Sequence, residues 1–120
     1  YTQAPLVDVP KNTVVLVVEG YQDQPIHIPL RRKIFLGRQF PSDNPPLDLS
    51  PYGAHEAGVS RQHAVLTVMA DGCVIEDLAS TNGTWLNNMR IAPYLRYEVK
   101  SADRIQLGHM PLYIYFDFTG

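Results

Sequence analysis

Proline and glycine interrupt this chain so often that a long helix has little room to form. The 120 residues include ten prolines and eight glycines, and no stretch of a dozen residues keeps helical periodicity without meeting one of them. The segments between them are short runs of aliphatic, β-branched and aromatic residues, which favour strands. Many short strands with closely spaced turns predict an all-β fold, a sandwich of two antiparallel sheets. The runs are TVVLVV (13–18), PIHIPL (25–30), KIFLG (33–37), HAVLTVM (63–69), CVIEDL (73–78), TWLN (84–87), RIQLG (104–108) and PLYIYFDF (111–118).

The last run and the turns carry more detailed predictions. Residues 112–118 alternate in character, which is typical of a half-buried strand. Asp71-Gly72 predicts a hairpin turn in which both of these residues are central and favour positive φ. Asn82-Gly83 and Asn87-Asn88 are further turn signals, as are Gly20 and Gly108. The alternation places Leu112, Ile114, Phe116 and Phe118 on one face, and Tyr113, Tyr115 and Asp117 on the other.

Length and charge limit the classes of protein to consider. We expect residues 1–120 to form a single domain with its motifs within about 13–118, excised from a longer protein because the chain begins with Tyr1 and not Met. The formal net charge of −2 at pH 7 argues against a general nucleic-acid or anionic-membrane binder, although Arg31, Arg32, Lys33 and Arg38 fall close together. The longest aliphatic run, residues 14–18, is far too short to cross a membrane. Cys73 is alone and cannot form an internal disulfide, which fits a reducing, cytoplasmic location.

The segment from Gln39 to Ala57 differs from the rest, because it has few apolar residues. We expect an irregular loop, and loops this long in compact domains often bind ligands; a harmless surface insertion is the alternative. Its structure-breaking residues are Pro41, Pro45, Pro46, Pro51 and Gly53.

Polar residues gather at the ends of three predicted strands. Loops meet at the two ends of a sandwich, so residues distant in sequence can converge on one site. The guanidinium groups of Arg38 and Arg61 match the oxygens of a phosphate, and Ser60, Thr81 and Asn82 add neutral donors. Each alone is an ordinary surface or turn residue, but together they predict an anion site. The phrases are LGR (36–38), SRQH (60–63) and STNGT (80–84).

In this order, on an all-β chain of this length, the three phrases resemble the forkhead-associated (FHA) domain. The FHA pattern places Gly-Arg at the end of one strand, Ser-Arg-x-His before another and Asn-Gly-Thr after Asp-Leu. The resemblance implies a sandwich of about eleven strands that binds phosphothreonine peptides on its loops, with no catalytic activity and no cofactor. The matching stretches are KIFLGR (33–38), SRQHAVL (60–66), DLASTNGTWLN (77–87) and DRIQLG (103–108).

The resemblance implies binding roles for five residues. Arg38 should bind the phosphate directly, Ser60 should hydrogen-bond one of its oxygens, and Arg61 should act as a second cationic partner. Thr81 should help to line the phosphate pocket, and Asn82 should hold the peptide main chain beside the phosphothreonine. The expected partner is therefore a phosphothreonine-containing protein, either a Ser/Thr kinase or one of its substrates.

Three more positions match residues that shape the architecture of the family. His63 should brace the loop that carries Ser60, Gly37 should allow close packing beside Arg38, and Gly83 should supply a turn conformation that a side chain disfavours.

One position departs from the family pattern. Some relatives have a basic residue two positions before the motif serine, where it reads an acidic side chain of the ligand, and this chain has Gly58 there. Any preference for flanking sequence must then come from elsewhere, such as Tyr52 and His55 in the long loop or the segment around His109.

The same residue types suggest alternatives to phosphopeptide binding. Ser60 and His63 with Asp77 are the residue types of a hydrolase triad, but Ser60 lacks a Gly-x-Ser-x-Gly elbow and has an arginine neighbour. The four histidines and the one cysteine show no metal-ligand spacing. A further alternative keeps the FHA fold with a phosphate-independent interaction surface.

Cys73, Trp85 and the aromatic residues of the last strand are expected to be core residues, with Cys73 unreactive.

Overall fold

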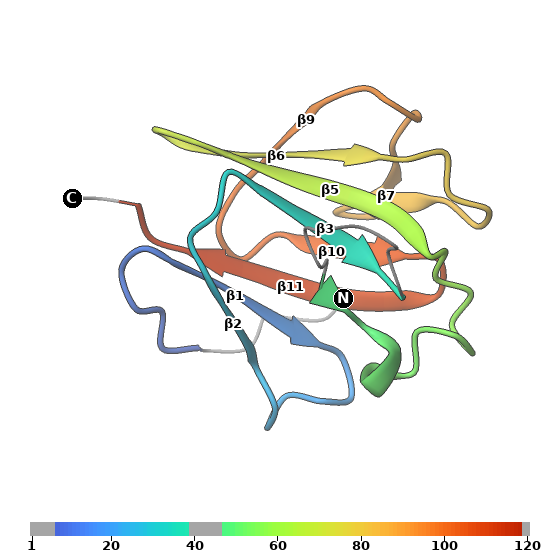
Figure 1. Cartoon of the computed structure of the whole chain (residues 1–120), viewed down its shortest axis with the longest axis horizontal. Coiled ribbons are helices and arrows are strands. Elements are labelled where there is room, and N and C mark those ends of the chain that lie inside the picture. Colours follow the sequence, from blue (N-terminus) through green and yellow to red (C-terminus); the bar gives the residue numbers. More distant parts are fainter. Residues whose placement is uncertain (1–6, 39–46, 119–120) are drawn as a thin grey trace.

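The computed structural model describes residues 7–38 and 47–118, and within them the chain forms eleven strands and one short 3₁₀ helix, η1 (Ser50–Tyr52). Figure 1 shows the strands in two layers. In the described part of the chain, no helix has the length and hydropathy to span a membrane. The strands are β1 (Thr13–Val18), β2 (Ile26–Pro29), β3 (Lys33–Gly37), β4 (Leu47–Asp48), β5 (Gln62–Met69), β6 (Gly72–Asp77), β7 (Thr84–Leu86), β8 (Met89–Arg90), β9 (Tyr97–Val99), β10 (Arg104–Leu107) and β11 (Met110–Phe116).

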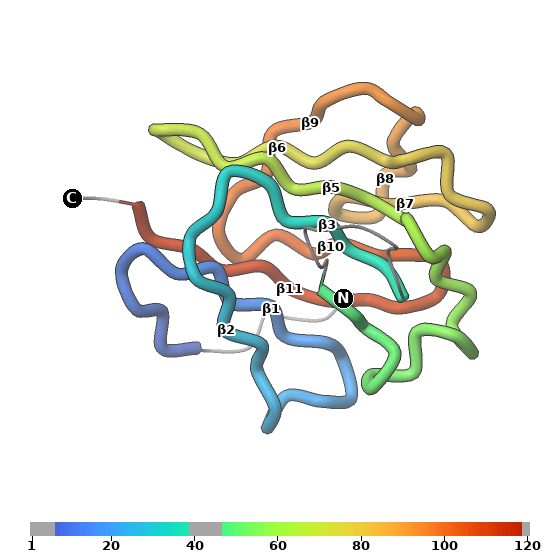
Figure 2. Tube along the Cα trace, viewed as in Figure 1, coloured from blue at the N-terminus to red at the C-terminus, as the bar shows by residue number. Residues whose placement is uncertain are grey.

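The strands form a six-stranded sheet, in the order β2-β1-β11-β10-β7-β8, and a five-stranded sheet, in the order β4-β3-β5-β6-β9. The predicted all-β sandwich is confirmed. One pair departs from the antiparallel pattern, because the two-residue strand β4 runs parallel to β3. Among the described strands, the chain changes sheet four times, between β2 and β3, β6 and β7, β8 and β9, and β9 and β10, so segments distant in sequence meet at the ends of the sandwich (Figure 2).

Strand β11 is central to the six-stranded sheet, and its two faces are buried in different clusters. Leu112 and Ile114 are fully buried between the sheets, as the alternation predicts. On the other face, Tyr113 and Tyr115 form a second buried cluster with residues of β1. The prediction of a half-buried strand was therefore correct in period and wrong about exposure, because residues before β1 cover the outer face. The members of this second cluster are Val15, Val17, Tyr113 and Tyr115, with Val7 and Val9 packed against them.

The turns follow the sequence signals in one case and depart from them in another. Asn87 and Asn88 have φ values of 48° and 70°, the left-handed pair that a tight hairpin between β7 and β8 requires. The predicted β5–β6 hairpin exists, but Met69 pairs with Gly72, so Ala70 and Asp71 form its turn. Neither Asp71 nor Gly72 has a positive φ, and the predicted turn type was wrong.

The long segment after β3 is more ordered than its composition indicates. Residues 39–46 lie outside the described part of the chain, but the remainder contains β4 and η1. Leu49 and Ala54 have no solvent exposure and belong to the main core cluster. Residues 47–57 are therefore anchored to the core, and the expectation of an irregular loop was wrong for this part of the segment.

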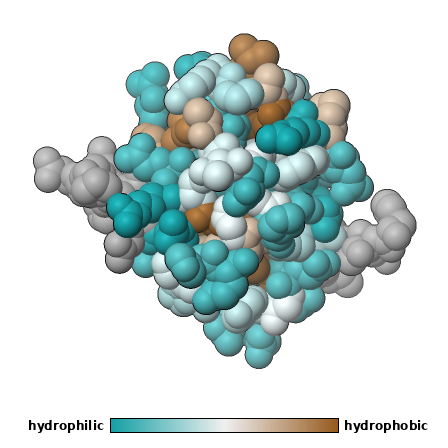
Figure 3. Space-filling view, turned by 90° about the vertical axis from the view of Figure 1, so that its right-hand side faces the viewer, coloured by the Kyte–Doolittle hydropathy of each residue, from teal (hydrophilic) through white to brown (hydrophobic). Residues whose placement is uncertain are grey.

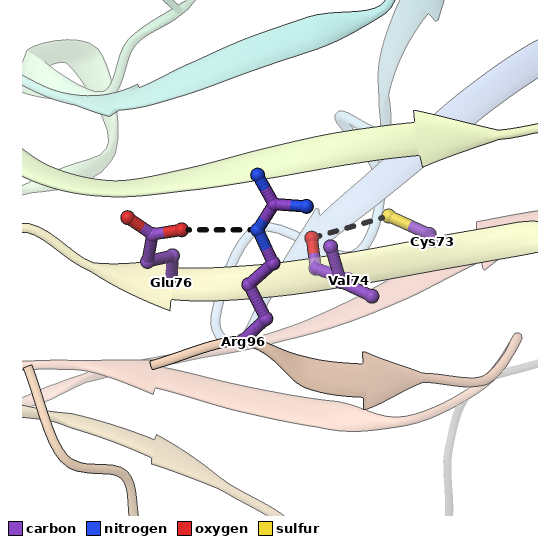
Figure 4. A network of polar contacts seen from close by, with 4 residues as sticks. All are labelled: Cys73, Val74, Glu76 and Arg96. Carbon is purple, nitrogen blue, oxygen red and sulfur yellow. Dashed lines mark hydrogen bonds and ion pairs between the residues drawn. The ribbon is translucent and has the colours of Figure 1, made fainter. Parts of the chain in front are cut away.

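The expected core positions on β6 and β7 behave differently. Cys73 is buried, its thiol faces the carbonyl of Val74 at 3.8 Å (Figure 4), and burial raises the pKa of this thiol to about 12. The thiol is thus held in its unreactive neutral form. Trp85 is only half-buried, contrary to expectation, and the guanidinium of Arg90 lies 5.3 Å from its ring centroid. Figure 4 also shows Arg96 reaching across β6 to Glu76.

Candidate functional site

The polar residues singled out in the sequence come together at one end of the sandwich. The connections before β5, between β6 and β7 and between β10 and β11 lie together on the right of Figures 1 and 2. Figure 3 looks onto this end of the molecule, where hydrophilic residues cover most of the surface and hydrophobic colour is confined to small areas.

Arg38 is held in place by backbone and side-chain contacts immediately after β3. The pairing of β3 with β5 shifts between Leu36 and Gly37, which is a β-bulge, and the Arg38 amide then donates to the carbonyl of Arg61 at 3.2 Å. Nε of Arg38 donates to the carbonyl of Val59 at 2.6 Å, and Nη1 donates to Nδ1 of His55 at 3.0 Å. Because a guanidinium can only donate, His55 accepts through an unprotonated Nδ1.

These contacts orient Arg38 without neutralising it. Both of its side-chain partners are uncharged acceptors, and Nη2 donates to none of the described residues. The Arg61 side chain is exposed and likewise makes no ion pair within the described ranges. The site therefore presents positive charge with donors still available for an anion.

Ser60, Thr81 and Asn82 tie two loops together. The Thr81 amide donates to Oγ of Ser60 at 3.0 Å, and Nδ2 of Asn82 donates to the carbonyl of Gly58 at 2.9 Å. Because Oγ of Ser60 accepts in this contact, its own hydrogen stays available to a ligand. The side chains of Thr81 and Asn82 are exposed at the surface of the site.

His63 lies beneath these loops with no solvent exposure. Its Nδ1 accepts from the Ser60 amide at 2.9 Å, and its Nε2 donates to the carbonyl of Gly83 at 2.8 Å. The two contacts define a neutral ring that bridges the loop before β5 and the loop before β7. Burial lowers the pKa of His63, an effect opposed by the hydrogen bond to Gly83 and the negative charge of Asp77. Gly83 has a φ of 89°, which side chains disfavour.

Asp77 organises the β6–β7 connection, which is a role that the sequence analysis missed. Its Oδ1 accepts from the hydroxyls of Ser80 at 2.6 Å and Thr84 at 2.7 Å, and its Oδ2 accepts from the Ser80 amide at 3.2 Å. Oγ of Ser80 in turn accepts from the Gly83 amide at 3.0 Å. The signal that could have indicated this role is the three-residue spacing from Asp77 to Ser80 and from Ser80 to Gly83, which is typical of side-chain-capped turns.

These contacts do not assemble the triad considered from the sequence. Both ring nitrogens of His63 bond backbone groups, and the carboxylate of Asp77 bonds Ser80 and Thr84 instead of the imidazole. Oγ of Ser60 has the Thr81 amide as its partner. The described residues also contain no group of three His, Cys, Asp or Glu side chains placed to hold a metal ion.

The departure at Gly58 has a structural explanation. Gly58 has a φ of 74°, and a Cβ added there would lie 2.5 Å from Nδ2 of Asn82. A basic side chain at this position would therefore be strained and would displace the Asn82 amide from its hydrogen bond. In this chain the side chain of Asn82 occupies the space that a side chain at position 58 would need.

Comparisons with known proteins identify a family and individual relatives of this chain. The FHA domain family model matches residues 34–108, a range that contains every predicted site residue. Protein FraH of Nostoc sp. is 36% identical over 94 residues, which are 77% of this chain and 32% of FraH. The chain spans between about a tenth and a third of the length of the curated relatives that it matches.

Solved structures match the fold as well. One FHA domain, solved in work on phosphothreonine-dependent FHA domain interactions, has a TM-score of 0.67 at 24% identity and covers 88% of this chain and 97% of its own. The N-terminal FHA domain of Saccharomyces cerevisiae Rad53p, solved in complex with a phosphothreonine peptide, has a TM-score of 0.68 at 18% identity and covers 88% and 94%.

The burial of neutral His63 predicts a loss of stability in mild acid. Its pKa is lowered in the folded state, so below the unfolded-state value of about 6.5 the unfolded chain binds a proton that the folded chain does not. The contribution of His63 to the free energy of unfolding should be complete above pH 6.5 and should decrease as the pH falls below it. Urea denaturation at pH 7.5 and 5.5 should show a larger decrease for the wild type than for His63→Gln, whose amide can both donate and accept but does not titrate.

An NMR titration of the wild type provides the control. While the domain stays folded, the ring of His63 should protonate only at a pH below the ordinary histidine pKa of about 6.5, because burial lowers its pKa. A His63 ring that protonates above pH 6.5, with the fold intact, would contradict the assignment.

Proposed function

The chain belongs to the FHA domain family, and we propose that it binds phosphothreonine peptides through the loops at the Arg38 end of the sandwich. The observation that carries the proposal is the state of Arg38: Val59 and His55 orient its guanidinium, and no carboxylate of the described residues pairs with it. A cation held in place without a counter-ion is suited to an incoming phosphate, because little rotamer freedom is lost on binding.

The neighbouring residues complete the recognition of a phosphate group. The free hydrogen of the Ser60 hydroxyl supports a bond to one phosphate oxygen, and the exposed guanidinium of Arg61 supports a second cationic contact. The carboxylate of Asp77 is buried and already accepts three hydrogen bonds, so its charge is directed away from the ligand.

Thr81 and Asn82 supply the contacts beside the phosphate. Both side chains are exposed at the tip of the β6–β7 connection, which is fixed by its bonds to Ser60 and Gly58. The Asn82 amide keeps its carbonyl oxygen for a main-chain amide of the peptide, which matches the role that the family resemblance implies.

A phosphothreonine peptide implies a Ser/Thr kinase in the same system. The kinase itself or one of its substrates would then be the partner, and the domain would act as a binding module without catalysis of its own. The second candidate keeps the FHA fold and binds a partner without phosphate.

The dependence of peptide binding on phosphate distinguishes the two candidate functions. We expect calorimetry to give micromolar binding of a phosphothreonine peptide, about −7 to −9 kcal/mol, and little binding of the same peptide without phosphate. Arg38→Ala should weaken the binding by about 2–5 kcal/mol, because the phosphate loses a partner in a partly desolvated site.

The matched control for Arg38→Ala is Lys100→Ala. Lys100 is an exposed cation between β9 and β10 and makes no ion pair within the described residues. Its substitution removes the same charge and should leave affinity almost unchanged. Equal affinity for the phosphorylated and unphosphorylated peptides would support the phosphate-independent candidate.

His55 provides a test of how Arg38 is positioned. His55→Ala removes the acceptor of the Nη1 bond and should weaken phosphopeptide binding by about 0.5–1.5 kcal/mol, the usual net value of one hydrogen bond. His55→Gln keeps an acceptor and should retain more of the affinity. Calorimetry on both variants measures the difference, and identical losses would show that the Arg38 contact is not the reason for the effect.

The methyl group of threonine should add a preference over phosphoserine. Arg38, Ser60 and Arg61 contact the phosphate, which both ligands share, so the methyl must make the difference. Burial of one methyl contributes about 0.8 kcal/mol, and the methyl also restricts χ1 of the free ligand. Titration of matched peptides should therefore show a preference of about 1–2 kcal/mol, or roughly five- to thirty-fold. Equal affinities would mean that the methyl stays in solvent.

A further inference from the structure

A groove lies between the two sheets at the edge formed by β2, β3 and β4. It has a volume of about 650 Å³, and its lining includes residues 26–29 and 31–35. Figure 2 shows the passage of the chain from β2 to β3 between these residues. Isoleucines and a leucine from both sheets line it, two of them buried and two half-buried. These apolar residues are Ile26, Ile28, Ile34 and Leu47.

Basic residues lie beside the apolar residues of the groove. Arg31, Arg32 and Lys33 are consecutive in the sequence, exposed and part of the lining. No acidic residue is among the described residues that line the groove, and none of the three cations forms an ion pair within the described ranges. The chain as a whole carries a net charge of −2, so this local positive charge is opposite in sign to the average.

The groove is separate from the proposed phosphate site. Lys33 begins β3, and Arg38 follows the end of that strand. At about 3.3 Å per residue, five residues of strand place their backbones roughly 16 Å apart. A single phosphate therefore cannot contact both Arg38 and the basic residues of the groove.

We propose that the groove binds an extended acidic peptide segment in which aspartate or glutamate alternates with aliphatic residues. Successive side chains of an extended peptide point to opposite sides, so the aliphatic ones can enter the groove while the acidic ones reach Arg31, Arg32 and Lys33. The flanking strands favour this occupant, because β2 and β4 are the outermost strands of their sheets. Edge strands have backbone groups that an extended peptide can pair with.

The groove favours a peptide over nucleic acid or an anionic membrane. Polyanions gain affinity from many cations, and the described residues that line this groove include two arginines, one lysine and one histidine. Its aliphatic surface offers contact area to apolar side chains, and a phosphate backbone gains nothing from it.

The test uses a fluorescein-labelled, unphosphorylated peptide of four glutamate-valine repeats, with binding followed by fluorescence anisotropy. We expect saturable binding at 50 mM NaCl that weakens at 300 mM, because exposed charge pairs are screened by salt. The double variant Arg31→Glu/Arg32→Glu should weaken binding roughly ten-fold or more, because it converts attraction into repulsion.

Two control variants locate the effect. Arg96→Glu/Lys100→Glu makes the same change in net charge on exposed residues outside the groove and should bind the peptide like the wild type. Arg38→Ala should also retain binding, since the proposed phosphate site is separate. NMR on the wild-type domain should show peptide-induced shifts in β2 and β3, and this mapping does not depend on the folding of any variant.

Several results would overturn the proposal. These are an absence of binding at 1 mM peptide, equal losses in the two double variants, loss of binding in Arg38→Ala, or shifts confined to the loops around Ser60 and Thr81. Equal binding of a glutamate-serine peptide would remove the role of the apolar surface. Tighter binding of a single-stranded oligonucleotide or of phosphatidylserine vesicles, with the same dependence on Arg31 and Arg32, would assign the groove to that other class of ligand. Because the probe lacks phosphate, none of these results depends on whether phosphothreonine binds.

Discussion

The bridge made by His63 is the interaction on which the rest of the candidate site depends. One imidazole accepts from the Ser60 amide and donates to the Gly83 carbonyl, joining a loop of the five-stranded sheet to a loop that leads into the six-stranded sheet. The ring can do both only while it is neutral and buried. The Gly83 carbonyl also accepts from the Gly108 amide at 2.9 Å, so strand β5, the β6–β7 connection and the β10–β11 connection meet at one oxygen. The bridge supports from beneath the two loops that the bonds from Thr81 to Ser60 and from Asn82 to Gly58 join at the surface.

The site keeps its positive charge available because Asp77, the one buried carboxylate in the part of the chain that the structure describes, is hydrogen-bonded to other residues. Asp77 accepts hydrogen bonds from Ser80 and Thr84, and these bonds shape the loop without placing negative charge beside Arg38. Arg38 in turn is oriented by neutral acceptors, a carbonyl and an unprotonated imidazole nitrogen. The same side chains that give the loops their shape therefore separate the charges, which is the condition an anion site requires.

Strand β3 connects the two basic regions of the molecule. Its first residue, Lys33, is on the rim of the groove, and Arg38 follows its last residue at the proposed phosphate site. A rigid strand fixes their separation, so a partner with both a phosphothreonine and a distant acidic segment could contact both regions at once. Simultaneous contacts of this kind raise affinity through effective concentration, provided that the linker can span the distance.

The sequence by itself determined the features that depend on neighbouring residues. Short β-branched runs predicted the strands, Asn87-Asn88 predicted a turn, and the three polar phrases indicated which residues would form the site. Local steric rules govern the strands and the turn, and they act over a few residues. The β5–β6 turn was misplaced by one residue because its register is set by the pairing of Met69 with Gly72, which is a property of the two strands and not of the turn.

Only the tertiary structure decided which residues of the candidate site contact one another. That His63 bonds Gly83 and not Asp77, that His55 orients Arg38, and that Gly58 must leave room for Asn82 are contacts across 17 to 24 residues of sequence. The burial of the outer face of β11 and the half-exposure of Trp85 likewise depend on which segments cover each sheet. Side-chain chemistry limits the possible partners of each residue, but the order of strands in the two sheets determines which partner comes within hydrogen-bonding distance.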